Sequence, residues 1–241
     1  MTALMTLENI SVSRANKVLF SHFSCDIKAG EITVILGPNG AGKSSLLLAM
    51  AGLIPVNGHI ECIGKTLCTD DRKSITQKLA WQGDLPPTEF GLTVEQRLGL
   101  IGDSPQAIQS IALVFDIISL LKRSLAELSS GERQRVELSA LMLRDVPIWL
   151  LDEPTSHLDL KHQVCCMRML KEEASKGKSI VVILHDLEQA YAISDHLILI
   201  NGKGDVCVGS RDDLFNTKVL SKLFGVTLMQ QNNVLLPNYA V

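Results

Sequence analysis

The feature that most constrains this chain is a glycine-rich segment, Gly37–Ser44, which reads GPNGAGKS and matches the pattern G-x-x-x-x-G-K-[ST]. A short β-branched run, Glu31–Leu36, precedes it, and the helical pattern Ser44–Leu53 follows it. Glycines let consecutive N–H groups face one anion, and the following helix presents its positive N-terminal end to the same anion. The segment therefore predicts a phosphate-binding loop between a strand and a helix.

Single residues of this loop have separate expected roles. Lys43 would place a positive charge at the β- and γ-phosphates of a nucleotide, and Ser44 would offer its hydroxyl to Mg²⁺. The alternative, a glycine-rich turn with a surface lysine, does not account for the strand and helix on either side. The residues that we expect to bind the nucleotide here are Gly37, Pro38, Asn39, Gly40, Ala41, Gly42, Lys43, Ser44 and Ser45.

Two further segments, Pro147–Leu151 and Ser179–Leu184, are apolar throughout, as strands covered on both faces are. Together with Glu31–Leu36 they predict a mainly parallel sheet. Thr93–Leu128 instead has apolar residues at helical spacing, which predicts a helical insert. Antiparallel strands are expected at Leu4–Val12, at Cys25–Lys28, and at Leu197–Val208 with a turn at Asn201–Gly204.

Two acidic residues, Asp152 and Glu153, end the apolar strand that begins at Pro147. The carboxyl edge of such a sheet is where α/β folds bind ligands. Asp152 would hold Mg²⁺, while Glu153 would act as a general base on the attacking water. His185 follows a second strand and would donate to the γ-phosphate or orient that water. A solvated acidic strand end and a packing histidine are the alternatives, and the phosphate loop makes both less favourable.

Composition and charge exclude several classes of function. The net charge of −3 gives no long-range attraction for polyanions, so nucleic acid is not an expected partner. The six cysteines form no C-x-x-C pair and are expected to be reduced thiols. The N-terminal residues lack the apolar core of a signal peptide, and no apolar run reaches the ~20 residues that cross a bilayer. We expect any membrane association to come through another chain.

A second motif narrows the superfamily. Leu128–Arg135 reads LSSGERQR and resembles L-S-G-G-Q-x-Q-R, the signature of ATP-binding cassette (ABC) ATPases, with departures at Ser130 and Glu132. A serine with small residues at a helix N-terminus is a second anion site, which one triphosphate seldom needs. An ordinary capping box, with Ser129 as the cap and Glu132 at the third helical position, is the alternative. Residues Ser156–Asp159 resemble the S-x-L-D loop of the same family.

This resemblance covers nearly the whole chain and implies an α/β P-loop NTPase fold of ABC type. That fold has a mainly parallel core sheet, an antiparallel β subdomain and a helical insert. We expect one domain, with residues 1–84 and 145–241 as core and β subdomain and 85–144 as helical subdomain. The resemblance implies Mg²⁺-dependent ATP hydrolysis in a head-to-tail homodimer. In that dimer Ser129, Ser130 and Gly131 close over the partner's ATP, and Asp159 couples the two sites.

Two positions depart from the family pattern. An aromatic residue often stacks on adenine about 25 residues before the phosphate loop, and this chain offers Arg14 there. The loop that normally carries a glutamine toward Mg²⁺ contains both Gln82 and Asp84. We assign Gln82 as a metal ligand and catalytic residue because a neutral amide suits that role, and Asp84 stays open.

The short insert and the C-terminal residues resemble ATPase subunits of importers for vitamin B12, ferric siderophores and haem, with the B12 branch most similar. The expected partners are integral-membrane permease subunits, on the cytoplasmic face of the inner membrane, and a substrate-binding protein. A coupling helix of the permease would enter a groove at Gln82–Thr93, where Leu92 and Val94 would transmit movement. The main alternative is a soluble ABC-type clamp in DNA repair or translation, and a phosphotransferase is a third reading. The chain has neither the long coiled coils nor the tandem ATPase domains of clamps.

Overall fold

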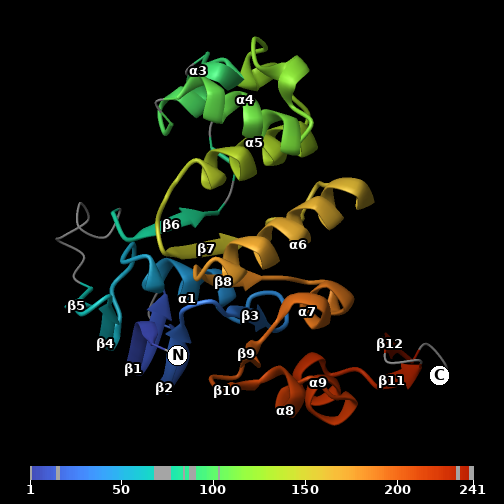
Figure 1. Ribbon diagram of the computed structural model, residues 1–241. Coiled ribbons are helices and arrows are strands. Elements are labelled where there is room, and N and C mark those ends of the chain that lie inside the picture. The colour runs from blue at the N-terminus through green and yellow to red at the C-terminus, as the bar shows by residue number, and fades with distance from the viewer. Residues whose placement is uncertain are drawn as a thin grey trace.

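The computed structural model describes residues 2–14, 17–67, 77–83, 85–86, 91–102, 104–231 and 234–238. Asp84 lies outside the described residues. Figure 1 shows a central sheet with helices against it. An antiparallel sheet of N-terminal strands lies at the lower left, and a helical lobe lies above the central sheet. These three parts match the α/β core, β subdomain and helical insert expected from the sequence.

The central sheet has six strands. They are β3 (Ile32–Leu36), β6 (Leu79–Gln82), β7 (Ile148–Asp152), β8 (Ser179–Ile183), β9 (His196–Ile200) and β10 (Val206–Ser210). Their order is β10-β9-β3-β8-β7-β6. Each neighbouring pair is parallel except β10 and β9, which form a hairpin. The expected mainly parallel sheet is confirmed, and β7 and β8 deliver their carboxyl ends side by side.

Both faces of this sheet are buried, because it separates two hydrophobic cores. Successive residues of a strand point to opposite faces, so Val34 and Val182 enter one core while Ile35 and Ile183 enter the other. This explains why the strand sequences are apolar throughout instead of alternating. The helices that contribute to these cores include α1 (Lys43–Met50), α5 (Ser130–Met142), α6 (Leu160–Ser175) and α7 (Leu187–Ile193).

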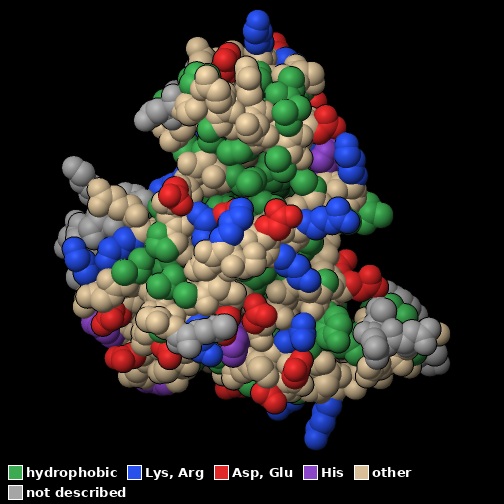
Figure 2. Space-filling view, viewed as in Figure 1, with side chains coloured by type: hydrophobic (Ala, Val, Ile, Leu, Met, Phe, Trp, Pro, Cys, Tyr) green, Lys and Arg blue, Asp and Glu red, His purple; other side chains and the backbone are tan. Residues whose placement is uncertain are grey.

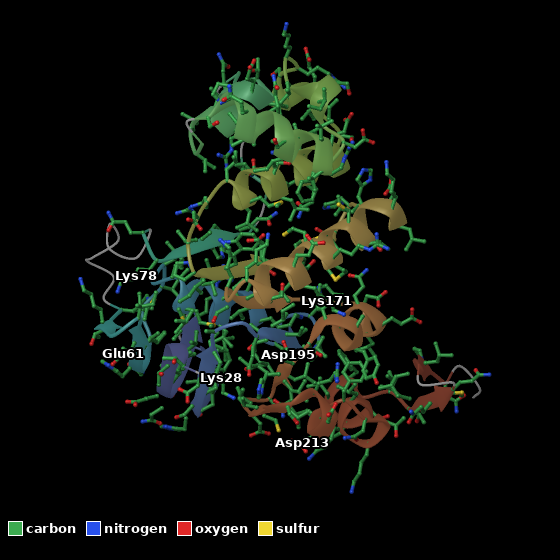
Figure 3. All side chains as sticks on the ribbon, in the orientation of Figure 1. Lys28, Glu61, Lys78, Lys171, Asp195 and Asp213 are labelled. Carbon is green, nitrogen blue, oxygen red and sulfur yellow. The ribbon has the colours of Figure 1, made fainter. Side chains whose placement is uncertain are left out.

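The antiparallel sheet packs over α1. Its strands are β1 (Ala3–Arg14), β2 (Lys17–Lys28), β4 (Asn57–Cys62) and β5 (Lys65–Thr66), in the order β2-β1-β4-β5. Lys78, just before β6, donates to the carbonyls of Cys62 and Ile63 at 3.2 Å each and so joins this sheet to the central one (Figure 3). β2 is longer than the predicted Cys25–Lys28, and β4 was not expected because only two of its six residues are buried.

The helical lobe contains α3 (Val94–Gly99), α4 (Pro105–Val114), two 3₁₀ turns (Ile118–Leu120 and Leu125–Glu127) and α5. Thr93 caps α3 with a full capping box. Arg97 on α3 donates to both carboxylate oxygens of Glu137 on α5, at 3.1 and 2.6 Å, which fixes the two helices together. The expected helical insert is confirmed.

Between this lobe and α6, Figure 2 shows a gathering of hydrophobic side chains. They border an open groove of about 700 Å³ whose apolar lining residues are Val114, Met142, Leu160, Val164, Cys165 and Met169. In the part of the chain that the structure describes, no helix is long and apolar enough to cross a bilayer.

The C-terminal part contains α8 (Arg211–Leu214), α9 (Thr217–Phe224) and the hairpin of β11 (Leu228–Gln231) and β12 (Val234–Pro237). Asp195, which precedes β9 and is labelled in Figure 3, accepts the backbone N–H of Ile32 with its carboxylate at 2.8 Å and that of Arg211 with its carbonyl at 2.9 Å, so it ties α8 to the first residue of β3. The C-terminal residues that resemble importer ATPase subunits thus form short helices and a strand pair.

The segment Leu79–Gln82 differs from its expectation. We expected a loop, and it forms the edge strand β6, paired in parallel with β7. Only four residues long, with Trp81 partly exposed between buried neighbours, it is too short to give a clear strand pattern. Gln82 is the last residue of this strand, so the pairing with β7 fixes its position.

Candidate nucleotide-binding and hydrolysis site

The phosphate loop joins β3 to α1 and depends on glycine at specific positions. A Cβ atom at Gly37 would lie 2.1 Å from the carbonyl oxygen of Ile200, so only glycine fits there. Gly40 and Gly42 adopt φ values of 76° and 104°, which other residues rarely adopt. Gly42 is also the N-cap of α1 and has no side chain to satisfy the first helical N–H groups. The loop therefore leaves backbone donors for an anion at a helix N-terminus.

Lys43 lies inside this loop and is nearly buried. Its Nζ donates to the carbonyls of Gly37 and Pro38, at 2.9 and 3.1 Å. Burial lowers the pKa of Lys43, and the charges of Glu153 and Asp152 act in the opposite direction. The ammonium group thus holds the loop's own carbonyls, at the place where a phosphate chain would offer stronger acceptors.

The two acidic residues lie at the carboxyl edge of the sheet, as expected from the sequence. Asp152 ends β7, and Glu153 follows it with φ of 50°, a left-handed conformation that turns the chain sharply. His185 follows β8, and its Nε2 lies 2.5 Å from Oε1 of Glu153. The structure therefore brings together Glu153 and His185, two of the three residues predicted to be catalytic.

A cavity of about 270 Å³ lies between the phosphate loop and these acids. Ser44, Asp152 and Glu153 line it, together with Gln134, Ser156 and His157. A hydroxyl and a carboxylate in one small polar cavity are oxygen donors of the kind that Mg²⁺ takes. Beside the glycine cradle, whose contact at Gly37 leaves no room for a Cβ atom, these donors fit a magnesium nucleotide.

Gln82 lies opposite Leu151, the residue before Asp152, in the pairing of β6 with β7. Its side chain is buried at the end of β6, and both amide atoms lack a hydrogen-bond partner among the described residues. It lines a second cavity, of about 160 Å³, together with Trp81, Arg97, Glu137 and Arg144, and it is not among the residues lining the Ser44 cavity. Gly83, the next residue, lines both cavities, and the role of Gln82 as a Mg²⁺ ligand stays a prediction.

The signature residues lie at the N-terminus of α5. The hydroxyl of Ser129 accepts the N–H of Glu132 at 3.3 Å, and Glu132 accepts the N–H of Ser129 at 2.8 Å, so the capping box is formed. The Ser129 hydroxyl also donates to the Glu132 carboxylate at 2.8 Å, and the two hydrogen bonds that this carboxylate accepts from Ser129 lower the pKa of Glu132. A cavity of about 450 Å³ here is lined by Ser129, Ser130, Gly131, Arg135, His157 and Asp159. No residue of the phosphate loop lines it, whereas His157 lines this cavity and the Ser44 cavity.

Sequence reasoning missed the contacts that join these motifs within the chain. Gln134 on α5 is buried and donates to the carbonyl of Pro154 at 2.9 Å. Arg133 donates to the carbonyl of Pro86, beyond Gln82. Thr155 donates to Gln189 at 2.9 Å, which links the loop after Glu153 to α7. Each joins residues at least 20 positions apart, and the sequence pattern gave no signal for such pairs.

Arg14, the candidate for stacking on adenine, is exposed at the end of β1. It pairs with Lys17 across the hairpin to β2. In the same part of β2, Leu19 and Phe20 lie against Gly42, since a Cβ atom there would be 3.2 and 3.1 Å from their side chains. The start of β2 therefore lies beside the phosphate loop.

The chain is similar to known proteins over the segment that contains the phosphate loop, the signature residues and Glu153. Residues 20–156 match the family model described as ABC transporter. The hemin import ATP-binding protein of Shewanella denitrificans is 34% identical over 92% of this chain and 93% of its own length. The vitamin B12 import ATP-binding protein of Yersinia enterocolitica is 32% identical, over 95% and 94%.

Solved structures show the same fold. An ATP-binding subunit of an ABC transporter has a TM-score of 0.80 and 23% identity, over 91% of this chain and 94% of its own. A structure described as an inward-facing ABC transporter of metal-chelate type has a TM-score of 0.81 and 23% identity, over 99% and 98%. With a family model spanning more than half of the chain and relatives above 30% identity along nearly all of it, this chain belongs to the ABC transporter family and is one of its ATPases.

Proposed function

We propose that this chain is the ATP-hydrolysing subunit of an importer and works as a homodimer with two ATP molecules between the subunits. One observation carries this proposal. The phosphate loop and the signature residues lie at different cavities of the same chain, although both are built to hold an anion. A second copy in the opposite orientation would bring its signature cavity to the first copy's phosphate loop.

The proposed chemistry follows from where the polar groups lie. Lys43 exchanges the carbonyls of Gly37 and Pro38 for phosphate oxygens, because a charged acceptor gives the stronger hydrogen bond. Glu153 takes the proton of the attacking water, and His185, already hydrogen-bonded to it, orients the carboxylate. When bound, Mg²⁺ would supply charge that offsets the charge developing on the phosphates, held by Ser44 and Asp152. Gln82 would join it only after leaving its present cavity.

The membrane partner would lie on the cavity that holds Gln82. This cavity is lined by Trp81, Pro86, Ile101 and Arg144, from the edge strand and the helical lobe. The proposed partner is a helix of an integral-membrane permease, and the chain would then lie on the cytoplasmic face of the inner membrane. Val94, which we expected to transmit movement here, is fully buried, so it would act through the core and not by touching the partner. Leu92 is partly buried and packs against the core.

The proposed cargo is a metal chelate of the class to which haem and vitamin B12 belong. Support comes from the two relatives, one a hemin import and the other a vitamin B12 import ATP-binding protein. Residues 85–144 would be the lobe that moves when the dimer closes. A substrate-binding protein would complete the system on the other side of the membrane.

Ser129→Arg tests the two-subunit site. A bulky cation at this N-cap should prevent closure over the partner's ATP and abolish ATP turnover, while the loss of the cap costs only about 1 kcal/mol of stability. Nucleotide binding to the monomer, measured with a fluorescent ATP analogue, should persist. Ser110→Arg, at an exposed serine on α4 away from both cavities, is the matched control. Wild-type turnover by Ser129→Arg would rule out the proposed dimer.

A further inference from the structure

We propose that His162 and Gln163, consecutive residues of α6, are positioning residues that hold residues 155–159 in the conformation needed for hydrolysis. This inference rests on the proposed function, because it concerns the loop that would face the second subunit. The loop connects Glu153 to α6. It contributes His157 to the Ser44 cavity and to the cavity of the signature residues, and Asp159 to the latter. Its placement therefore affects both sites of a dimer.

His162 holds the outer end of the loop. Its backbone N–H donates to Oδ1 of Asp159 at 2.9 Å, as in any helix N-cap. Its ring adds a second contact, because Nδ1 lies 2.7 Å from the same oxygen. A carboxylate can only accept, so Nδ1 carries the hydrogen. The His162 side chain is 10% exposed and that of Asp159 is 67% exposed, so a buried imidazole fixes a carboxylate on the surface.

Gln163, the next residue of α6, holds the loop at two further points. Its amide nitrogen donates to the carbonyl of Leu158 at 3.0 Å. Its amide oxygen accepts from Gln189 at 3.1 Å, and Gln189 in turn accepts from the hydroxyl of Thr155 at 2.9 Å. Gln189 lies in the first turn of α7, a helix that begins two residues after His185. These hydrogen bonds run from Thr155 through Gln189 and Gln163 to Leu158. They thus join the loop to α7, the helix that follows His185.

The loop needs such support because its backbone is unfavourable by itself. His157 adopts φ of 64°, which residues other than glycine adopt infrequently. Its carbonyl also touches the signature helix closely, since a Cβ atom at Gly131 would lie 2.6 Å from it. A small displacement of the loop would therefore move His157 against α5. We infer that His162 and Gln163 set the distance between Glu153, the loop and the signature helix.

The test compares His162→Phe, which keeps the ring shape without a donor, with His162→Asn, whose amide nitrogen can take the place of Nδ1. Gln163→Met removes both amide contacts at similar length. We expect kcat for ATP hydrolysis to fall about 10-fold in His162→Phe and Gln163→Met, since small misplacements cost up to 100-fold. KM for ATP and the thermal midpoint should stay near wild type, and His162→Asn should recover most of kcat. His59→Asn, at an exposed histidine of β4, is the matched control.

A double-mutant cycle separates positioning from general damage. In an Asp159→Ala background, His162→Phe should cause little further loss, because the imidazole acts through that carboxylate. Wild-type kcat in His162→Phe, equal losses in His162→Phe and His162→Asn, or additive losses in the cycle would each overturn the proposal. The proposed function is tested separately by the unmodified chain and by Ser129→Arg, so its failure would be recognised apart from this one.

Discussion

At the scale of single residues, the site is assembled from side chains that already have partners. Lys43 binds loop carbonyls, Glu153 binds His185, and Ser129 binds Glu132. The Lys43 contact is buried, whereas the Glu153–His185 and Ser129–Glu132 contacts are exposed at the surface. A nucleotide would have to replace several of them, so the present arrangement is that of a site ready to exchange internal hydrogen bonds for phosphate contacts.

Glu153→Gln isolates the proposed general base. The amide keeps the size of the side chain and can still hydrogen-bond to His185, so folding and ATP binding should be unchanged. Hydrolysis should slow by about 10²–10⁴-fold, the usual loss for a general base. Because ATP is then not consumed, gel filtration with ATP should show a stable dimer. Glu188→Gln, an exposed acid on α7, is the control, and unchanged hydrolysis in Glu153→Gln would contradict the assignment.

At the scale of elements, the sequence predicted those that follow from local pattern. The phosphate loop, the buried strands β7 and β8 and the helical insert could be found because glycine spacing and apolar periodicity are local properties. β6 could not be predicted, because its hydrogen bonds come from β7, 66 or more positions along the chain. The burial of Val94 could not be predicted either, since an apolar residue after a helix cap can line a surface groove or pack in a core.

Trp81→Ala and Val94→Ala should distinguish the groove from the core. Trp81 is 37% exposed at the edge of the Gln82 cavity, so its loss should reduce transport while ATPase activity of the isolated chain remains. Val94 is fully buried, so its loss should lower stability by roughly 1–3 kcal/mol. Transport assays, ATPase assays and thermal unfolding measure these effects. Leu113→Ala, on the exposed face of α4, should change none of them, and full transport by Trp81→Ala would exclude this groove.

At the scale of the whole molecule, α5 connects the parts that would have to move together. Its first turn carries the signature residues, Gln134 reaches the loop after Glu153, and Glu137 holds Arg97 of α3. Arg133 also contacts Pro86, in the segment that leads from the central sheet to the lobe. A displacement of α5 at the Ser44 cavity or at the signature residues would therefore also move the lining of the Gln82 cavity beside Trp81, because one helix contributes to all three.

The cargo can be tested with the complete transporter. The chain is copurified with its permease, the complex is placed in liposomes, and ATP turnover is measured with the binding protein and either hemin, cobalamin or a ferric chelate. We expect one of these three to raise turnover, because differential binding of cargo to one state of the complex is what shifts its equilibrium. The same complex with Glu153→Gln should show no stimulation. Stimulation by a sugar or an amino acid alone would overturn the cargo class, while leaving the ATPase assignment intact.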